Sequence, residues 1–74
     1  MRPAEMIDKI GDFRGELNKL SAYLEEGFNR LWDKYRTDED AWYLFKAYVE
    51  SKAYMKHLDD SLFLLQEELS LYEE

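Results

Sequence analysis

The sequence predicts an all-α protein, an antiparallel hairpin of two long helices that pack in the manner of a coiled coil. Three observations support this fold class. Pro3 is the only proline among 74 residues, and the three glycines stand apart from Asn, Asp and Pro, so the turn residues that β-hairpins need are missing. Apolar residues recur every three or four positions along two segments, as they do in amphipathic helices. One polar break near residue 37 separates these segments.

The first helix is expected from about residue 3 to about residue 36. Pro3 suits the first turn of a helix, where its missing N–H has no intrahelical partner to lose. The first apolar series consists of Met6, Ile10, Phe13, Leu17, Leu20, Leu24, Phe28, Leu31 and Tyr35. Its steps of three and four contain one extra residue around Gly27, which is the signature of a stutter in a coiled coil. We expect this stripe to face the second helix.

The second helix is expected from about residue 38 to about residue 73, after a turn at about residues 36–38. Thr37 and Asp40 approximate a capping box, and three acids near this end match the positive pole of the helix dipole. The second apolar series consists of Ala41, Leu44, Tyr48, Ser51, Met55, Leu58, Leu62, Leu65, Leu69 and Tyr72. Its steps alternate between three and four without a fault, so it also predicts a stripe along one helical face.

The two helices are expected to lie antiparallel in one fixed register. Their connection is too short to do more than reverse the chain. The two series then pair along their whole length, from Met6 with Leu69 through Phe28 with Tyr48. A rise of 1.5 Å per residue makes the hairpin about 50 Å long. Residues 1–74 are therefore expected to form a single domain.

The core of such a hairpin is small for an independent fold. The chain has no cysteine, so disulfides are excluded, and a chain of this size rarely builds a sufficient core alone. Further aromatic and apolar residues flank the two series; the predicted partner-binding residues among them are Trp32, Trp42, Phe45, Val49 and Phe63. Either they widen the hairpin's own core, or another chain covers them. In the second case dimerisation or a helical partner completes a bundle.

No catalytic, cofactor-binding or metal-binding residue is predicted. His57 is the only histidine and lies outside the apolar series beside Lys56, and no Glu-x-x-His motif is present. Thiolate metal sites are excluded with the cysteines, and a phosphate loop would need a glycine-rich turn before a helix. We therefore expect a non-enzymatic protein that carries no cofactor and no metal.

The charge is acidic and unevenly distributed. The formal net charge is −7, yet residues 1–36 carry seven basic and seven acidic side chains, so the excess belongs to residues 37–74. Such acidity argues against direct binding of nucleic acid. The uncharged runs are too short to span a membrane, and the first residues lack the apolar core of a secretory signal, so a cytoplasmic location is expected.

An acidic face is predicted near the end of the second helix. Its residues are Asp59, Asp60, Glu67, Glu68, Glu73 and Glu74. Beyond Lys56 the sequence contains six acids and no Lys or Arg. The excess negative charge either keeps an aromatic-rich protein soluble or attracts a basic partner.

Residues near the turn resemble a known family. Phe28-Asn29-Arg30-Leu31 leads into the turn, Asp40-Ala41 follows it, and Glu50-Ser51-Lys52-Ala53 lies early in the second helix. Over roughly residues 28–53 this pattern resembles the small E-type co-chaperones of type III secretion needle subunits, which are helical hairpins of similar length. The abundance of Trp and Tyr and the acid-rich turn depart from that family.

The resemblance implies a cytoplasmic protein that pairs with a larger helical chaperone and holds an aggregation-prone needle subunit unpolymerised. It implies no catalytic residue. The leading hypothesis is accordingly a protein-binding module of the chaperone or assembly-factor type, which buries its aromatic flank against a helical partner. One alternative is a phage-type inhibitor whose acidic face replaces phosphates in a nucleic-acid-binding groove. Another is a structural homodimer in which two hairpins form a four-helix bundle.

Overall fold

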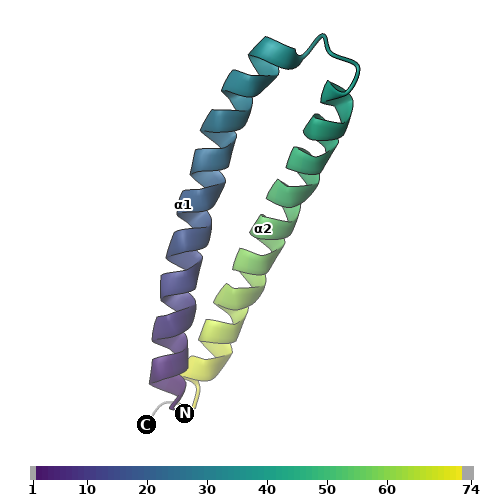
Figure 1. Cartoon of the computed structure of the whole chain (residues 1–74). Coiled ribbons are helices and arrows are strands. Elements are labelled where there is room, and N and C mark those ends of the chain that lie inside the picture. The colour runs from purple at the N-terminus through teal and green to yellow at the C-terminus, as the bar shows by residue number, and fades with distance from the viewer. Residues whose placement is uncertain (1, 73–74) are drawn as a thin grey trace.

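The computed structural model is a hairpin of two antiparallel α-helices, and it describes residues 2–72 (Figure 1). Helix α1 spans Pro3–Tyr35 and helix α2 spans Ala41–Ser70. The hairpin is a rod of 57 × 16 × 15 Å in which the start of α1 lies beside the end of α2, opposite the turn. The predicted all-α hairpin is confirmed.

Helix α1 begins and ends within one residue of its predicted bounds. Pro3 occupies the first turn after Arg2, whose backbone is extended, and the Met6 N–H donates to the Arg2 carbonyl at 3.2 Å. At the other end the Arg36 N–H donates to the Trp32 carbonyl at 2.9 Å, so the last turn is closed by the chain itself. No glycine cap is needed at this end.

Helix α2 begins at Ala41, three residues later than predicted. The expected capping box of Thr37 and Asp40 does not form, because the helix starts only after Asp40 and the Asp40 N–H binds Asp38 rather than Thr37. The Asp38 carboxylate instead accepts the Asp40 N–H at 3.2 Å, and its carbonyl accepts the Ala41 N–H at 3.1 Å. Asp side chains favour such local turns over helix interiors. The turn therefore extends over residues 36–40, and the three acids precede the helix.

The far end of α2 is also shorter than predicted. The helix ends at Ser70, and the Leu71 and Tyr72 N–H groups close a final turn on the Glu68 and Leu69 carbonyls. The expected end at about residue 73 lies outside the described residues.

The register of the two helices agrees with the prediction. The rings of Phe28 and Tyr48 stack with centroids 3.9 Å apart and planes inclined by 5°. Toward the open end, Gln66 Nε2 donates to the Ile7 carbonyl at 2.9 Å. The first contact joins a predicted pair, and the second lies within about two residues of the predicted height, so the two apolar series predicted the relative height of the helices to within about two residues.

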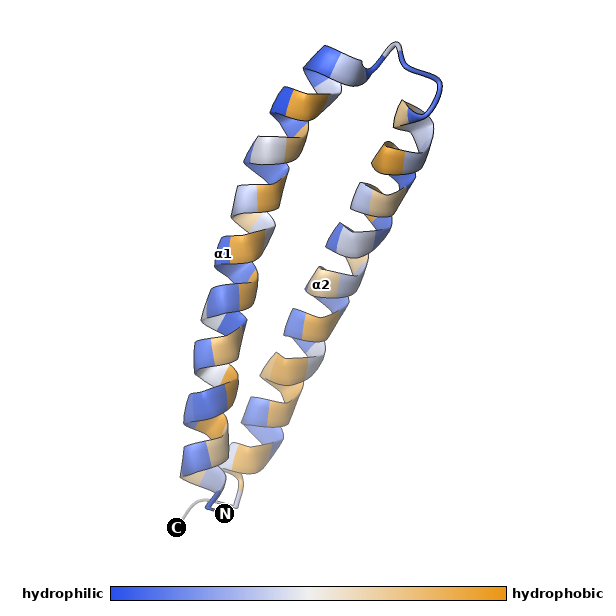
Figure 2. Ribbon diagram, viewed as in Figure 1, coloured by the Kyte–Doolittle hydropathy of each residue, from blue (hydrophilic) through white to orange (hydrophobic). Residues whose placement is uncertain are grey.

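The rotation of each helix about its own axis differs from the prediction. Apolar residues recur on successive turns of both helices (Figure 2). About half of the members of each series are partly or fully buried, namely Met6, Ile10, Leu17, Leu24 and Phe28 in α1 and Ala41, Tyr48, Met55, Leu62 and Leu69 in α2. The members between them, including Phe13, Leu20, Leu44 and Leu58, stay exposed. The expectation that whole stripes face the other helix is therefore wrong for about half of their residues.

The hairpin buries few side chains on its own. Among residues 2–72, only Leu17, Phe28 and Ala41 are buried apolar residues, and no side chain is fully buried. The chain exposes 6262 Å², whereas a compact monomer of 9.0 kDa exposes roughly 4,850 Å². A single hairpin therefore leaves much more surface in water than a compact protein of its mass.

Candidate protein-binding surface

One side of the hairpin, which we call the closed side, is bridged by polar residues of both helices: Arg14, Ser21, Lys52, Asp59 and Gln66. The Arg14 guanidinium donates through Nε to Asp59 Oδ1 at 2.8 Å and through a terminal nitrogen to Gln66 Oε1 at 2.8 Å. Gln66 in turn donates to the Ile7 carbonyl, so one side chain of α1 and two of α2 are linked in a chain. These bonds fix which side of each helix faces the other.

The pairing of Arg14 with Asp59 changes the titration of both groups. The hydrogen bond from the guanidinium lowers the pKa of Asp59, and the nearby positive charge adds to this effect against the opposing effect of desolvation. The same hydrogen bond raises the pKa of Arg14. Both groups are thereby held in their charged forms, as a bridge between the helices requires.

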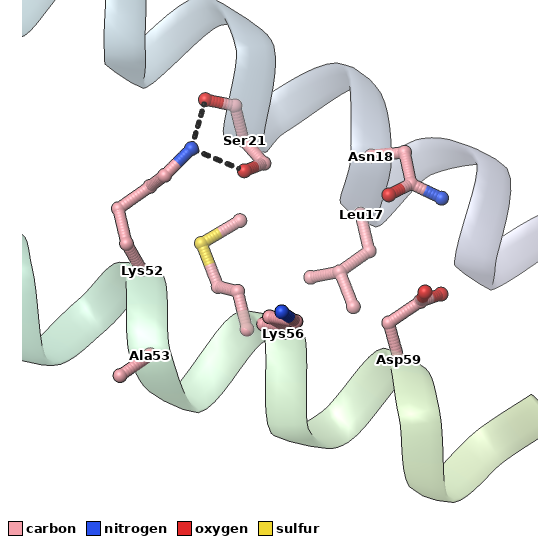
Figure 3. A pocket seen from close by; sticks show the side chains of 8 residues that line it. Leu17, Asn18, Ser21, Lys52, Ala53, Lys56 and Asp59 are labelled. Carbon is pink, nitrogen blue, oxygen red and sulfur yellow. Dashed lines mark hydrogen bonds between the residues drawn. The ribbon is translucent and has the colours of Figure 1, made fainter.

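A second polar bridge lies about two turns closer to the connection and borders a shallow hollow of about 400 Å³ (Figure 3). Lys52 Nζ donates to Ser21 Oγ at 2.7 Å and to the Ser21 carbonyl at 3.3 Å, and it lies 3.4 Å from Glu25 Oε2. Leu17, Asn18, Ala53, Met55, Lys56 and Asp59 complete the lining of the hollow. Its Lys52 and Asp59 are thus both engaged in joining the two helices.

Aromatic residues close the same side near the turn. Trp32 packs on Phe45 with ring centroids 5.1 Å apart, and both lie within about 6 Å of the Phe28 ring. Trp42 lies 6.2 Å from Phe45 at the edge of this cluster. The cluster buries aromatic surface inside the hairpin, in geometries that aromatic pairs favour.

The opposite side, which we call the apolar face, has no comparable bridge between the helices among residues 2–72. It is defined by Phe13, Leu20 and Leu31 of α1 and Leu44, Leu58 and Leu65 of α2. Each of these six side chains is 41–51% exposed. They recur along nearly the whole length of the rod, at the spacing of a continuous stripe on both helices. Monomeric proteins rarely leave an apolar stripe of this extent in water.

A groove of about 360 Å³ hollows the apolar face near the turn. Leu31 and Leu44 line it together with Tyr23, Leu24, Gly27, Phe28, Ala47, Tyr48 and Ser51. Its depth comes from small residues: a Cβ added at Gly27 would meet no atom within 4 Å. Small residues at this level allow another helix to approach the hairpin closely.

The five residues predicted to bind a partner lie on or beside the closed side. Trp32 and Phe45 are half-buried in the aromatic cluster and widen the hairpin's own core. Trp42 and Val49 are exposed. Phe63 is also partly exposed, with the Arg14 guanidinium 5.0 Å from its ring centroid. The structure thus divides this set between the hairpin core and an exposed flank.

The predicted acidic face is likewise divided. Asp59 is ion-paired with Arg14 between the helices, whereas Asp60, Glu67 and Glu68 are exposed. Glu73 and Glu74 lie outside the described residues. Within residues 2–72, no group of three or more His, Asp or Glu side chains is placed to hold a metal ion.

The apolar face was missed from the sequence because its residues were assigned to the hairpin interior. A signal for the true rotation was present. Arg14 and Ser21 are seven residues apart, and so are Lys52, Asp59 and Gln66 in turn. Residues seven apart share one face of a helix, so these polar residues form two facing stripes in the register that the apolar series predict.

Neither helix, over residues 2–72, is long and apolar enough to cross a membrane. Comparison with known proteins found no matching family model, curated protein or solved structure.

Proposed function

We propose that this chain is a non-enzymatic protein-binding module of the chaperone or assembly-factor type, which binds helices of another polypeptide through its apolar face. The observation that carries the proposal is the continuous exposure of Phe13, Leu20, Leu31, Leu44, Leu58 and Leu65 on one side of the rod. The hairpin core of three buried apolar residues supports it, because another chain would supply the missing burial.

The apolar face is a better binding surface than the aromatic flank predicted from sequence. Trp32 and Phe45 are engaged inside the hairpin, so their removal would disturb the fold as well as any interface. The leucines of the apolar face are about half exposed, so their removal disturbs the hairpin less. The resemblance to E-type co-chaperones contributes the chaperone type and the cytoplasmic location to this proposal.

Photo-crosslinking tests the proposal without knowledge of the partner. A photoreactive phenylalanine analogue replaces Leu58 on the apolar face, Trp42 on the exposed flank or Lys46 on the outer surface of α2, and the chain is expressed in its native cells. We expect crosslinks to a polypeptide from position 58 and only background from position 46. Crosslinks from position 42 alone would favour the aromatic flank. Background yield at all three positions, with helicity retained, would contradict the proposal.

A further inference from the structure

We propose that the polypeptide covering the apolar face is a second copy of this chain, related by a two-fold axis along the rod, so that both turns lie at the same end of a four-helix bundle. This inference rests on the proposed function and names its partner. Each α1 then packs against α2 of the other copy, and all neighbouring helices are antiparallel.

The surface area of the hairpin suits such a dimer. A compact protein of twice the mass exposes roughly 8,000 Å². Two hairpins of 6262 Å² each must bury about 4,500 Å² in total to reach that value. Obligate homodimers bury roughly 2,000–5,000 Å². The excess surface is therefore what one further copy removes.

The edges of the apolar face decide the orientation of the second copy. On α1 the edge consists first of Lys9, Glu16 and Tyr23, which recur at intervals of seven residues. Lys34 belongs to the same edge, because it lies seven residues after Gly27, which lines the groove. On α2 the edge follows groove-lining Ala47 at the same interval. Its members are Ala47, Tyr54, Ser61 and Glu68, and Asp40, seven residues before Ala47, continues it into the turn. These edges contact the second copy whether the two turns lie at the same end of the bundle or at opposite ends.

With the turns together, opposite charges meet at both ends of the bundle. The bond between Ile7 and Gln66 in the antiparallel hairpin places Lys9 level with Leu64, so Glu68 lies about one helical turn from the height of Lys9, toward the open end. Lys34 and Asp40 flank the turn. The axis along the rod preserves height, so Lys34 faces Asp40 of the second copy, and Lys9 comes within about one turn of Glu68, which two long side chains can span. None of the four ion pairs within residues 2–72 involves these residues.

The middle of the edge is compatible with the same arrangement. Tyr23 and Tyr54 are each 73% exposed in the hairpin, and the nearby contacts between the helices place them within about one turn of the same height. With the turns together, Tyr23 of each copy meets Tyr54 of the other copy across the interface. Aromatic pairs of this kind favour association and bury surface that water covers in a lone hairpin.

The reverse orientation brings like charges together. With the turns at opposite ends, α1 packs on α1 and α2 on α2. Lys9 then approaches Arg30 and Lys34 of the second copy, and Asp40 approaches Glu68. Within α2, residues 41–70, five acids also outnumber three lysines, so adjacent α2 helices would repel each other weakly. The charge pattern therefore selects the arrangement with both turns together.

Charge reversal tests the predicted pair at the open end. Lys9→Glu places two acids opposite each other at two symmetric sites and is expected to weaken self-association about tenfold in sedimentation equilibrium. Adding Glu68→Lys is expected to restore it. Lys46→Glu changes the net charge equally on the outer surface of α2 and is expected to change the dissociation constant by less than about twofold. Equal effects of Lys9→Glu and Lys46→Glu, or no rescue by the second change, would overturn the pairing.

A spin-label distance tests the orientation directly. The chain has no cysteine, so Thr37→Cys gives one label in each turn. Turns at the same end place the labels roughly 20 Å apart, about two helix-packing distances. Turns at opposite ends place them about 50 Å apart, the length of a helix, and that result would overturn the proposed arrangement. The absence of dipolar coupling in a monomeric protein would overturn the proposal that a second copy binds. Crosslinks from position 58 to a different polypeptide would then still support the proposed function.

Discussion

Alanine substitution of either of two leucines one turn apart in α1 distinguishes a lone hairpin from a hairpin that a second copy covers. Leu17 is 9% exposed and packs between the helices, whereas Leu20 is 48% exposed on the apolar face. The substitutions Leu17→Ala and Leu20→Ala remove the same atoms and change helix propensity equally. Any difference in their cost therefore reports what surrounds each side chain.

The expected costs follow from burial. Leu17→Ala should lower the free energy of unfolding by about 2–5 kcal/mol, as for leucines in a packed core. In a lone hairpin Leu20 loses only about half of its contact with water, so Leu20→Ala should cost about 1 kcal/mol. If a second copy covers the apolar face, Leu20 becomes a core residue as well. We then expect Leu20→Ala also to cost about 2–5 kcal/mol.

Urea unfolding followed by circular dichroism at 222 nm measures these costs. Each variant is unfolded at several protein concentrations, because the unfolding midpoint of a dimer rises with concentration. We expect this dependence in the unsubstituted chain and a lower midpoint for Leu20→Ala at every concentration. A cost of about 1 kcal/mol for Leu20→Ala, independent of concentration, would show that no second copy covers Leu20.

Other predictions concern the closed side and the glycines of α1. The pKa of Asp59 is lowered in the folded state, so the bond to Arg14 stabilises the fold above the ordinary aspartate pKa of about 3.9 and is lost as the pH falls through the lowered value. The difference in thermal midpoint between the unsubstituted chain and Asp59→Asn should therefore shrink between about pH 5 and pH 2, and a constant difference would contradict the role of the ion pair. Gly15→Ala should stabilise the protein by about 1 kcal/mol in urea unfolding, because its Cβ meets no atom within 4 Å. Gly11→Ala should stabilise the protein less, because its Cβ would lie 3.3 Å from Gln66 Nε2. Equal stabilisation by the two substitutions would contradict a steric cost at this contact.

The hairpin itself was predictable because its determinants are local and repeated. The missing turn residues exclude strands, and the three-and-four spacing of residues such as Leu17, Leu24 and Met55 requires helices with one apolar stripe. The register followed because two long series must pair over their whole length. The start of α2 was less predictable, since Asp38 competes for the backbone N–H groups that a cap at Thr37 would otherwise bind.

The location of the candidate site was not predictable from apolar spacing alone. A helix whose apolar stripe is wide enough for a four-helix bundle has two ways to turn toward its first neighbour. The choice depends on polar pairs such as Arg14 with Asp59 and Lys52 with Ser21, whose energy comes from specific geometry. An analysis of hydrophobic periodicity treats these residues as solvated, and so places Leu20 and its equivalents in the hairpin interior.

The mass of the protein in solution shows whether a second copy covers the apolar face. Sedimentation equilibrium of the full chain should give twice the 9.0 kDa chain mass. Leu58→Glu, which places a charge in the apolar face, should give 9.0 kDa with helicity retained, whereas Lys46→Glu should stay dimeric. A mass of 9.0 kDa for the unsubstituted chain, from micromolar to near-millimolar concentration, would contradict the claim that a second copy covers the apolar face.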